Sequence, residues 1–218
     1  MARFTKADVV TKAVQGPLIP VFYHAEIPYA RRVLQACYEG GVRLFEFTNR
    51  GANAFANFAD LQRFVEAEYP DLMLGAGTIY TVEEAERFIE AGADYIVQPI
   101  IGAEVAELCH RHDLAWLPGV STLNEIYQAD RLGATFAKLF PAAMLGPNYL
   151  KTVRAPLPQV RFMATGGIHP TPDTVAAWMQ VGATCVGVDS RMLQTDDPAA
   201  LTTQVEQLLA AMRPATPA

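Results

Sequence analysis

The stretch TVEEAERFIEAGADYIVQ, residues 81–98, contains the repeating unit from which the fold is inferred. Thr81 precedes an amphipathic run and Glu84 follows it three residues later, a capping-box pattern that begins a helix. Gly92 ends that helix, because glycine readily takes the left-handed conformation found after helix C-termini. The apolar run at 95–98 is typical of a buried strand. The stretch therefore predicts a helix, a tight turn and a strand in succession.

The same succession recurs along the chain. A glycine flanked by small or apolar residues separates a helical pattern from an apolar run at 40–42, 91–93, 132–134 and 181–183. The expected strands are Leu18–Tyr23, Leu44–Thr48, Leu72–Gly75, Tyr95–Gln98, Ala115–Leu117, Phe136–Phe140, Arg161–Ala164 and Cys185–Val188. The expected helices are Ile27–Gly40, Ala52–Glu68, Thr81–Ala91, Gly102–His112, Thr122–Leu132, Gly146–Ala155, Pro172–Val181 and Pro198–Met212.

Apolar strands joined by helices indicate a parallel sheet, which is either a closed barrel or an open doubly wound sheet. Eight strand–helix units in 218 residues favour the closed form. We therefore expect an α/β fold, a single (β/α)₈ TIM-barrel domain over 1–218, with the barrel at 16–212. An additional N-terminal helix is expected at Ala2–Val14, within residues 1–15, and a frayed tail at 213–218.

Composition excludes several classes of protein. The chain has 17 Lys plus Arg against 23 Asp plus Glu, a net charge of −6, and no basic stripe, so a nucleic-acid partner is not expected. Hydrophobic residues make up 51%, which excludes a disordered chain. The odd set Cys37, Cys109 and Cys185 predicts no disulfide framework, and residues 1–15 do not resemble a signal peptide. No apolar run approaches a membrane span, so we expect a soluble cytoplasmic protein.

Lys138 is the most informative polar residue, because active sites of such barrels lie where the strands end. It stands in an apolar strand and shares its face with Phe136 and Phe140. Burial would lower the pKa of this amine toward neutrality, and a neutral amine is what a Schiff-base nucleophile requires. The alternative is a lysine that pairs with a carboxylate or extends to the barrel mouth, and position alone does not separate the two.

Glu46 occupies the same kind of position on the second strand, where a carboxylate can transfer protons. The alternative interpretation is that Glu46 forms a buried ion pair with Arg50 or Lys138. A carboxylate beside a catalytic lysine can serve in both roles.

Arg50 follows Asn49 in a loop and could bind a substrate carboxylate, although a solvated arginine is the simpler interpretation. Thr78 offers a hydroxyl after Gly-Ala-Gly, or else caps a helix. Thr165, Gly166 and Gly167 follow the seventh strand, where barrels often bind phosphate.

Together these motifs resemble the 2-keto-3-deoxy-6-phosphogluconate (KDPG) and 4-hydroxy-2-oxoglutarate (KHG) aldolases. The resemblance runs from about residue 16 to residue 209, and its most specific part combines Glu-x-Thr-x-Arg with Lys-x-Phe-Pro-Ala. The motifs that carry it, in order, are EFTNR at 46–50, GAGT at 75–78, LPGVST at 117–122, KLFPA at 138–142 and ATGGI at 164–168.

The resemblance implies a class I aldolase that needs no metal or other cofactor, is a homotrimer, and cleaves a 4-hydroxy-2-oxo acid to pyruvate and an aldehyde. Lys138 would form the Schiff base and Glu46 would be the acid and base. The residues that would contact substrate are Arg50 and Thr78 at its carboxylate, Phe140 and Pro99 near the lysine, and Thr165, Gly166, Gly167 and Ser190 toward its distal end. The aldehyde would be glyceraldehyde 3-phosphate or glyoxylate.

The chain departs from the family pattern at three places, the first of which is Asn49, where the family commonly has Leu or another apolar residue. Gln98-Pro99-Ile100 stands where the family commonly has Ser-Pro-Gly. Asp189 stands where a glycine is usual, and its charge would repel a phosphate unless the side chain points away or a cation such as Arg191 offsets it. Two other functions stay open, namely a phosphate-binding isomerase or epimerase with Glu46 as its base, and a sugar-acid binding protein without turnover.

Overall fold

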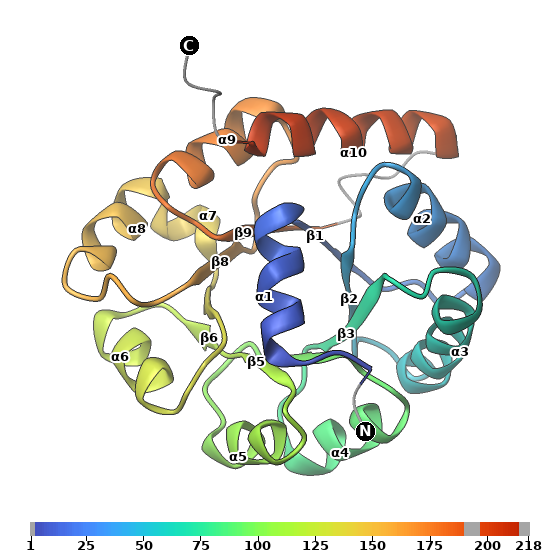
Figure 1. Ribbon diagram of the computed structural model, residues 1–218, viewed down its shortest axis with the longest axis horizontal. Helices are drawn as coiled ribbons and strands as arrows, with labels where there is room; N and C mark the ends of the chain where they lie inside the picture. The colour runs from blue at the N-terminus through green and yellow to red at the C-terminus, as the bar shows by residue number, and fades with distance from the viewer. Residues whose placement is uncertain (1–2, 190–196, 214–218) are drawn as a thin grey trace.

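The structure is a computed structural model that describes residues 3–189 and 197–213. Its strands run parallel and close into a barrel with helices around the outside (Figure 1). Their hydrogen-bonded order is β5-β4-β3-β2-β1-β9-β8-β7-β6. The strands are β1 (Leu18–Phe22), β2 (Leu44–Thr48), β3 (Met73–Gly77), β4 (Tyr95–Val97), β5 (Ala115–Leu117), β6 (Gly119–Val120), β7 (Ala137–Leu139), β8 (Phe162–Thr165) and β9 (Cys185–Asp189). The predicted barrel is confirmed.

The fifth strand position of the barrel is divided at Pro118. β5 pairs with β4, whereas β6, one residue later, pairs with β7. Proline has no N–H for a strand ladder, but its carbonyl oxygen accepts the N–H of Lys138 at 2.8 Å. The change of partner at Pro118 therefore closes the ring, and it extends this strand beyond the predicted end at Leu117.

The helices follow the predicted spacing closely. Their bounds are α1 (Lys6–Gln15), α2 (Ile27–Glu39), α3 (Ala54–Glu68), α4 (Val82–Glu90), α5 (Ala103–Arg111), α6 (Leu123–Arg131), α7 (Ala142–Leu145), α8 (Pro147–Arg154), α9 (Pro172–Gln180) and α10 (Pro198–Met212). Thr81 and Glu84 form the predicted capping box. The short α7 was not predicted. Over residues 3–189 and 197–213, none of the helices combines the length and apolar character needed to cross a bilayer.

Alternating strand residues separate the apolar interior into two clusters. Outward-facing residues such as Phe45, Phe47 and Leu74 pack under the helices. Inward-facing residues fill the barrel, and the buried members of that cluster are Val9, Ala13, Ile19, Leu44, Met73, Tyr95, Val97, Ala115, Leu117, Phe136, Met163 and Cys185. The strand period of two thus decides which side chains face the barrel axis.

Helix α1 covers the end of the barrel where the strands begin, and it lies across the centre of Figure 1. Val9 and Ala13 project from α1 into the interior cluster and are fully buried. The helix begins at Lys6 rather than at the predicted Ala2, because Thr5 and Asp8 form a capping box there. With this end closed by α1, the opposite end of the barrel is left for ligands.

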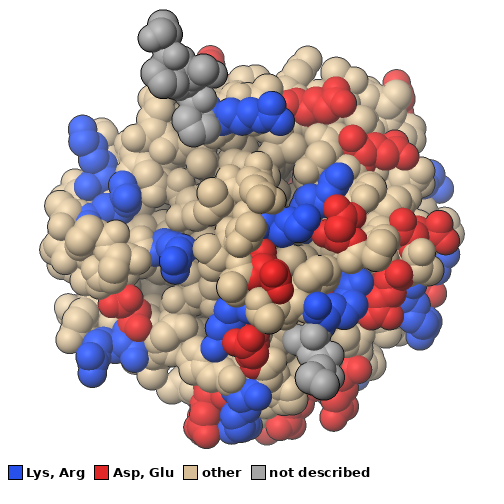
Figure 2. Space-filling model, in the orientation of Figure 1, with Lys and Arg blue, Asp and Glu red and all other residues tan. Residues whose placement is uncertain are grey.

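Charges of both signs are interspersed on the face that carries α1, as Figure 2 shows in the same orientation. Neither sign forms a stripe on the face in view. A basic footprint for a polyanion is therefore missing from this face of the described chain, as the net charge of −6 suggests.

Candidate active site

Most of the predicted site residues meet at the carboxyl ends of the strands. A cavity of about 310 Å³ opens there. It is lined by Val21, Arg50, Lys138, Phe140, Pro141, Ala143, Met144, Thr165, Gly166, Gly167 and Asp189. Its walls come from β1, β7, β8, β9 and α7, so residues far apart in the sequence converge as the barrel topology requires.

Lys138 and Glu46 form a buried ion pair at the base of this site. Lys138 is 4% exposed and Glu46 is 1% exposed. The Lys138 Nζ atom lies 3.8 Å from Glu46 Oε1, which is ion-pair distance but too long for a hydrogen bond. Among the described residues, neither Glu46 oxygen has a hydrogen-bond partner. A carboxylate left unsatisfied in this way is poised to bond to something that enters the cavity.

Burial lowers the pKa of Lys138, and the Arg50 charge lowers it further. The Glu46 carboxylate acts in the opposite direction, because a nearby anion stabilises the ammonium form. The net direction is downward. Lys138 therefore carries a neutral amine at a lower pH than an exposed lysine does, which is the property a nucleophilic amine needs.

Two glycines of β3 make room for the side chains of neighbouring strands. A Cβ at Gly77 would lie 2.0 Å from Glu46 Oε1, so only glycine lets the carboxylate lie across β3. A Cβ at Gly75 would lie 2.1 Å from the Tyr95 ring. The glycines of the Gly-Ala-Gly motif thus accommodate the side chains of Glu46 and Tyr95.

Arg50 and Thr78 form the polar rim of the site. Arg50 Nε donates a hydrogen bond to Thr78 Oγ1 at 3.1 Å, and Arg50 is exposed at the mouth. Thr78 has a φ of 61°, a left-handed conformation unusual for a β-branched residue. It is not a helix cap, because Thr81 caps α4. Arg50 also lines the cavity, where a guanidinium can bind a carboxylate.

Phe140 and the two glycines after β8 form the wall beside Lys138. Lys138 Nζ lies 5.3 Å from the centre of the Phe140 ring. A Cβ at Gly166 would lie 2.7 Å from that ring, and both Gly166 and Gly167 have positive φ values. Thr165 is buried and lines the same cavity. The amine of Lys138 therefore shares the cavity with an aromatic ring and with glycine backbone.

Pro99 is a predicted contact that does not line this cavity. Pro99 lines a neighbouring cavity of about 270 Å³, which shares Phe140 but not Lys138. The cause is the close packing of Pro99 on the strand-five segment: a Cβ at Gly119 would lie 2.2 Å from its carbonyl oxygen. Ser190 and Arg191 lie outside the described residues, whereas Asp189 does line the main cavity.

The sequence interpretation missed Val21, Ala143, Met144 and Tyr95 as neighbours of the site. Val21 could have been found from the strand period, because it pairs with both Glu46 and Asp189 in neighbouring strands. Ala143 and Met144 lie on the unpredicted helix α7. Tyr95 has the sequence pattern of an ordinary buried aromatic residue. Its ring extends across β3 only because Gly75, in another strand, has no side chain.

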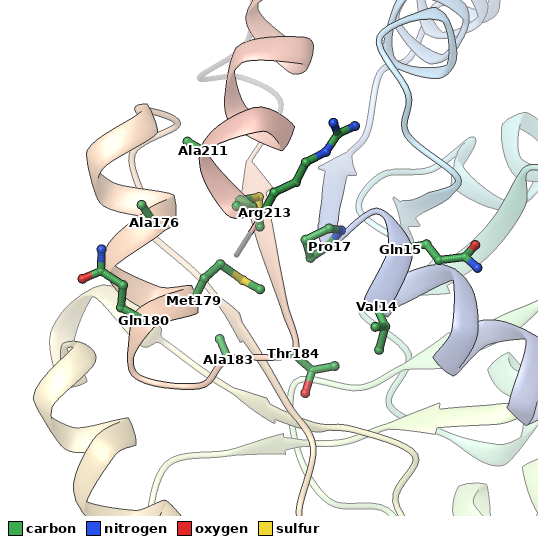
Figure 3. Close-up of a pocket in the computed structure, with 11 residues that line it drawn as sticks. Val14, Gln15, Pro17, Ala176, Met179, Gln180, Ala183, Thr184, Ala211 and Arg213 are labelled. Atoms are coloured by element: carbon green, nitrogen blue, oxygen red, sulfur yellow. The ribbon is translucent and has the colours of Figure 1, made fainter. Parts of the chain in front are cut away.

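A larger cavity of about 970 Å³ lies at the opposite end of the barrel, between α1, α9 and α10 (Figure 3). Val14, Met179 and Ala211 give it mainly apolar walls, and Arg213 is the titratable side chain among its lining residues. It contains none of the predicted site residues. Size therefore does not identify the reactive site, whereas the buried amine and carboxylate do.

The chain matches the family model described as KDPG and KHG aldolase over residues 9–206. A relative from Treponema pallidum, a 2-dehydro-3-deoxy-phosphogluconate aldolase, is 35% identical over 70% of this chain and 71% of its own. A KHG/KDPG aldolase of Escherichia coli K12 is 32% identical over 71% of each chain. The crystal structure of a Legionella pneumophila KDPG aldolase with pyruvate captured as a covalent carbinolamine superposes with a TM-score of 0.80 at 25% identity, covering 91% of this chain and 97% of that one. With the family model matched over most of its length, this chain belongs to the KDPG and KHG aldolases.

Proposed function

We propose that this family member is a Schiff-base aldolase that reversibly cleaves a 4-hydroxy-2-oxo acid to pyruvate and an aldehyde. The observation that carries the proposal is the Lys138 amine, 4% exposed, with its pKa lowered by burial and a carboxylate 3.8 Å away. A buried amine beside an acid-base group, facing an open cavity, is the arrangement that covalent carbonyl chemistry requires.

In the proposed reaction the neutral Lys138 amine attacks the C2 ketone of the substrate and forms a carbinolamine. Loss of water then gives an iminium. When the C3–C4 bond breaks, its electron pair moves toward the iminium nitrogen and leaves an enamine, while the C4 hydroxyl loses its proton and becomes the aldehyde. Protonation of the enamine at C3 and hydrolysis release pyruvate and restore the amine. Lys138 thus serves as the electron sink.

Glu46 is proposed as the group that moves the protons. Its two oxygens lie within the buried pair and have no protein hydrogen-bond partner in the described chain. As a carboxylate it can accept the proton that the attacking amine loses, and as the resulting acid it can give that proton to the departing carbinolamine oxygen, which leaves as water. The carboxylate so restored can accept the proton of the C4 hydroxyl and return it to C3 of the enamine. At 3.8 Å the Lys138 Nζ and Glu46 Oε1 atoms are close enough for one water or substrate oxygen beside the pair to hydrogen-bond to both.

The remaining polar groups are proposed to orient the substrate. Arg50, held by Thr78, would grip the C1 carboxylate with its remaining N–H groups. Phe140 would pack beside the iminium. Thr165, Gly166 and Gly167 would face the distal end of the substrate, where they line the cavity. Two further contacts, Pro99 and Ser190, stay predictions from the sequence.

The names of the relatives support two substrate types, KDPG and KHG, which would give glyceraldehyde 3-phosphate or glyoxylate with pyruvate. The choice depends on the distal end of the cavity. Asp189 is among the residues that line this cavity, and a carboxylate near the distal end of the substrate would disfavour a phosphate there. A panel of phosphorylated and unphosphorylated 2-keto-3-deoxy acids, compared by kcat/KM, separates these substrates.

Assembly and location are proposed on the family resemblance. We expect a homotrimer, which analytical ultracentrifugation would detect as three times the chain mass. A reducing cytoplasm suits the thiols of Cys37, Cys109 and Cys185, all free and buried. No cofactor is assigned to the reaction, since the lysine itself supplies the electron sink.

The decisive experiment is borohydride reduction in the presence of pyruvate, followed by peptide mass analysis. The expected result is a reduced pyruvate adduct on Lys138 and not on the exposed surface residue Lys151. An unmodified Lys138 in folded protein would contradict the proposal. A coupled dehydrogenase assay for pyruvate release then separates an aldolase from an isomerase that uses Glu46 alone, and from a binding protein without turnover.

A further inference from the structure

Tyr95 reaches beneath the reactive pair from the neighbouring side of the barrel. Glu46 of β2 pairs with Gly75 of β3, and Gly75 pairs with Tyr95 of β4, so the three residues form one row across the sheet. Because Gly75 has no side chain, the Tyr95 ring lies over it, with Cζ 2.3 Å from where a Cβ would be. Cζ carries the hydroxyl. The row therefore directs the phenol from β4 toward the strand that carries Glu46.

The Tyr95 hydroxyl is a buried polar atom without a hydrogen-bond partner among the described residues, and both Glu46 oxygens are in the same state. Tyr95 is fully buried in the interior apolar cluster, below the cavity that Lys138 lines. Orphaned buried donors and acceptors are rare, and each costs free energy unless water or a ligand satisfies it. One donor and two acceptors in adjacent positions form the kind of polar site that holds a buried water.

The phenol is a donor at neutral pH. Burial raises the pKa of Tyr95 well above 10, and the charges of Glu46, Cys185 and Asp94 add to that direction. The titratable or charged groups that face this region are Lys138 on β7, Cys185 on β9, Asp94 before β4, and Arg50 and Asp189 at the mouth. Arg3 already binds Asp94 at the far end. The Tyr95 phenol is therefore an uncharged hydrogen-bond donor at the base of the site.

We propose that Tyr95 is a positioning residue that donates a hydrogen bond to the Glu46 carboxylate through one buried water molecule. The bond holds the carboxylate oriented toward Lys138. The inference rests on the proposed function, because it assigns a support to the group that would move the protons. It adds a residue, and a water site beneath the reactive pair, to the residues predicted from the sequence.

The variant that tests this is Tyr95→Phe, which removes the hydroxyl and keeps the ring over Gly75. We expect the acid limb of the kcat/KM profile to move to higher pH by about one unit, because a carboxylate that loses a hydrogen-bond donor is protonated more easily. KM should change little, and kcat should fall several-fold. Tyr38→Phe is the matched control: it removes a phenol that donates to Asp71 at 2.7 Å on the outside of the barrel, and its profile should follow the wild type.

Borohydride trapping with pyruvate keeps the two proposals separate. If wild type and Tyr95→Phe both form the Lys138 adduct and their pH profiles coincide, the positioning role is wrong while the aldolase proposal stands. If wild type forms no adduct, the proposed function fails and this inference fails with it. If Tyr95→Phe does not fold, a high-resolution crystal structure of the wild type decides. A water within hydrogen-bond distance of both Tyr95 and Glu46 supports the role, and a Tyr95 hydroxyl bonded elsewhere overturns it.

Discussion

Two buried carboxylates lie in the barrel, and their surroundings differ in kind. Asp94 and Glu46 are each 1% exposed. Asp94 accepts hydrogen bonds from Arg3 Nη2 at 2.6 Å, from Arg3 Nε at 3.1 Å and from the Leu74 N–H at 2.8 Å. Glu46 accepts none among the described residues and has only Lys138, 3.8 Å away. Equal burial therefore does not mean an equal role.

The difference shows how this fold separates stability from chemistry. Arg3 binds Asp94 and the Leu72 carbonyl at the end that α1 closes, so the Asp94 carboxylate is already hydrogen-bonded there. At the open end, Glu46 is left with unused hydrogen-bonding capacity, which costs stability and leaves it able to bond to a reacting molecule. We read a satisfied buried charge as structural and an unsatisfied one beside a cavity as functional.

The largest expected effect comes from removing the amine of the open end. Lys138→Met should lower kcat by at least about 10⁴-fold, because no other residue of the pair can form the iminium. Loss of the ammonium leaves the buried Glu46 carboxylate without its Lys138 partner, so we also expect a lower midpoint of thermal unfolding. Pyruvate release and thermal unfolding measure the two effects, with Lys151→Met as the surface control. Activity near that of the wild type would show that Lys138 is not the nucleophile.

Glu46 is the other member of the ion pair, and Glu46→Gln keeps the shape of its side chain while removing the charge. We expect kcat to fall by about 10²–10⁴-fold, the usual range for loss of an acid-base group. The pKa of Lys138 should fall further, because the Glu46 anion was raising it. The pH at which borohydride trapping reaches half its maximal rate should then move downward. An upward movement would mean that Glu46 does not act on the lysine.

At the end of the barrel that α1 closes, we expect a substitution to change stability and leave activity nearly unchanged. Asp94→Asn should lower the free energy of unfolding by about 2–3 kcal/mol, the loss expected for hydrogen bonds to a charged group. Its kcat should stay within about twofold of the wild type, because Asp94 lies away from the cavity. Urea denaturation measures the stability, and Asp113→Asn, whose partner Lys6 is 3.9 Å away at the surface, should cost far less. Equal losses in both variants would remove the structural role assigned to Asp94.

The same contrast shows what the sequence could predict. Lys138 and Glu46 were found because a charged residue in an apolar strand is visible in the sequence, and the strand period places it inside the barrel. The repeat of helix, glycine and strand predicted the fold for a similar reason, since each signal lies within a few residues. Asp94 was missed because its partner Arg3 is 91 residues away.

What stayed hidden depends on contacts between strands. The reach of Tyr95 depends on Gly75, and the exclusion of Pro99 from the main cavity depends on its packing against Gly119. The left-handed conformation of Thr78 is likewise set by the loop in which it lies. The contacts of Tyr95 and Pro99 have no local sequence signal, because each combines residues that are adjacent only after the barrel closes.

A substitution of Arg50 tests the electrostatics of the open end by removing a positive charge instead of a negative one. Arg50→Gln should raise KM about tenfold through loss of the charged contact with the substrate carboxylate. The pKa of Lys138 should rise, because the Arg50 charge was lowering it, so half-maximal trapping should move to higher pH. Steady-state kinetics and the trapping profile measure both, with Arg63→Gln as the exposed control. Shifts of the same sign in Glu46→Gln and Arg50→Gln would contradict the charge arrangement around Lys138.

The smallest expected effect lies at the distal wall, where Asp189 adds a third carboxylate to the comparison. It is neither enclosed like Asp94 nor part of the reactive pair, and its charge acts on whatever end of the substrate lies beside it. Asp189→Gly should raise kcat/KM for a phosphorylated acid relative to its unphosphorylated counterpart by about fivefold, equivalent to ~1 kcal/mol of repulsion near the surface. Asp189→Asn, which keeps the volume, should give the same direction if charge is the cause, and added salt should shrink the difference. A change in Asp189→Gly alone would instead point to the space that the side chain fills, and unchanged ratios in both variants would show that the distal end of the substrate binds beyond the reach of this carboxylate.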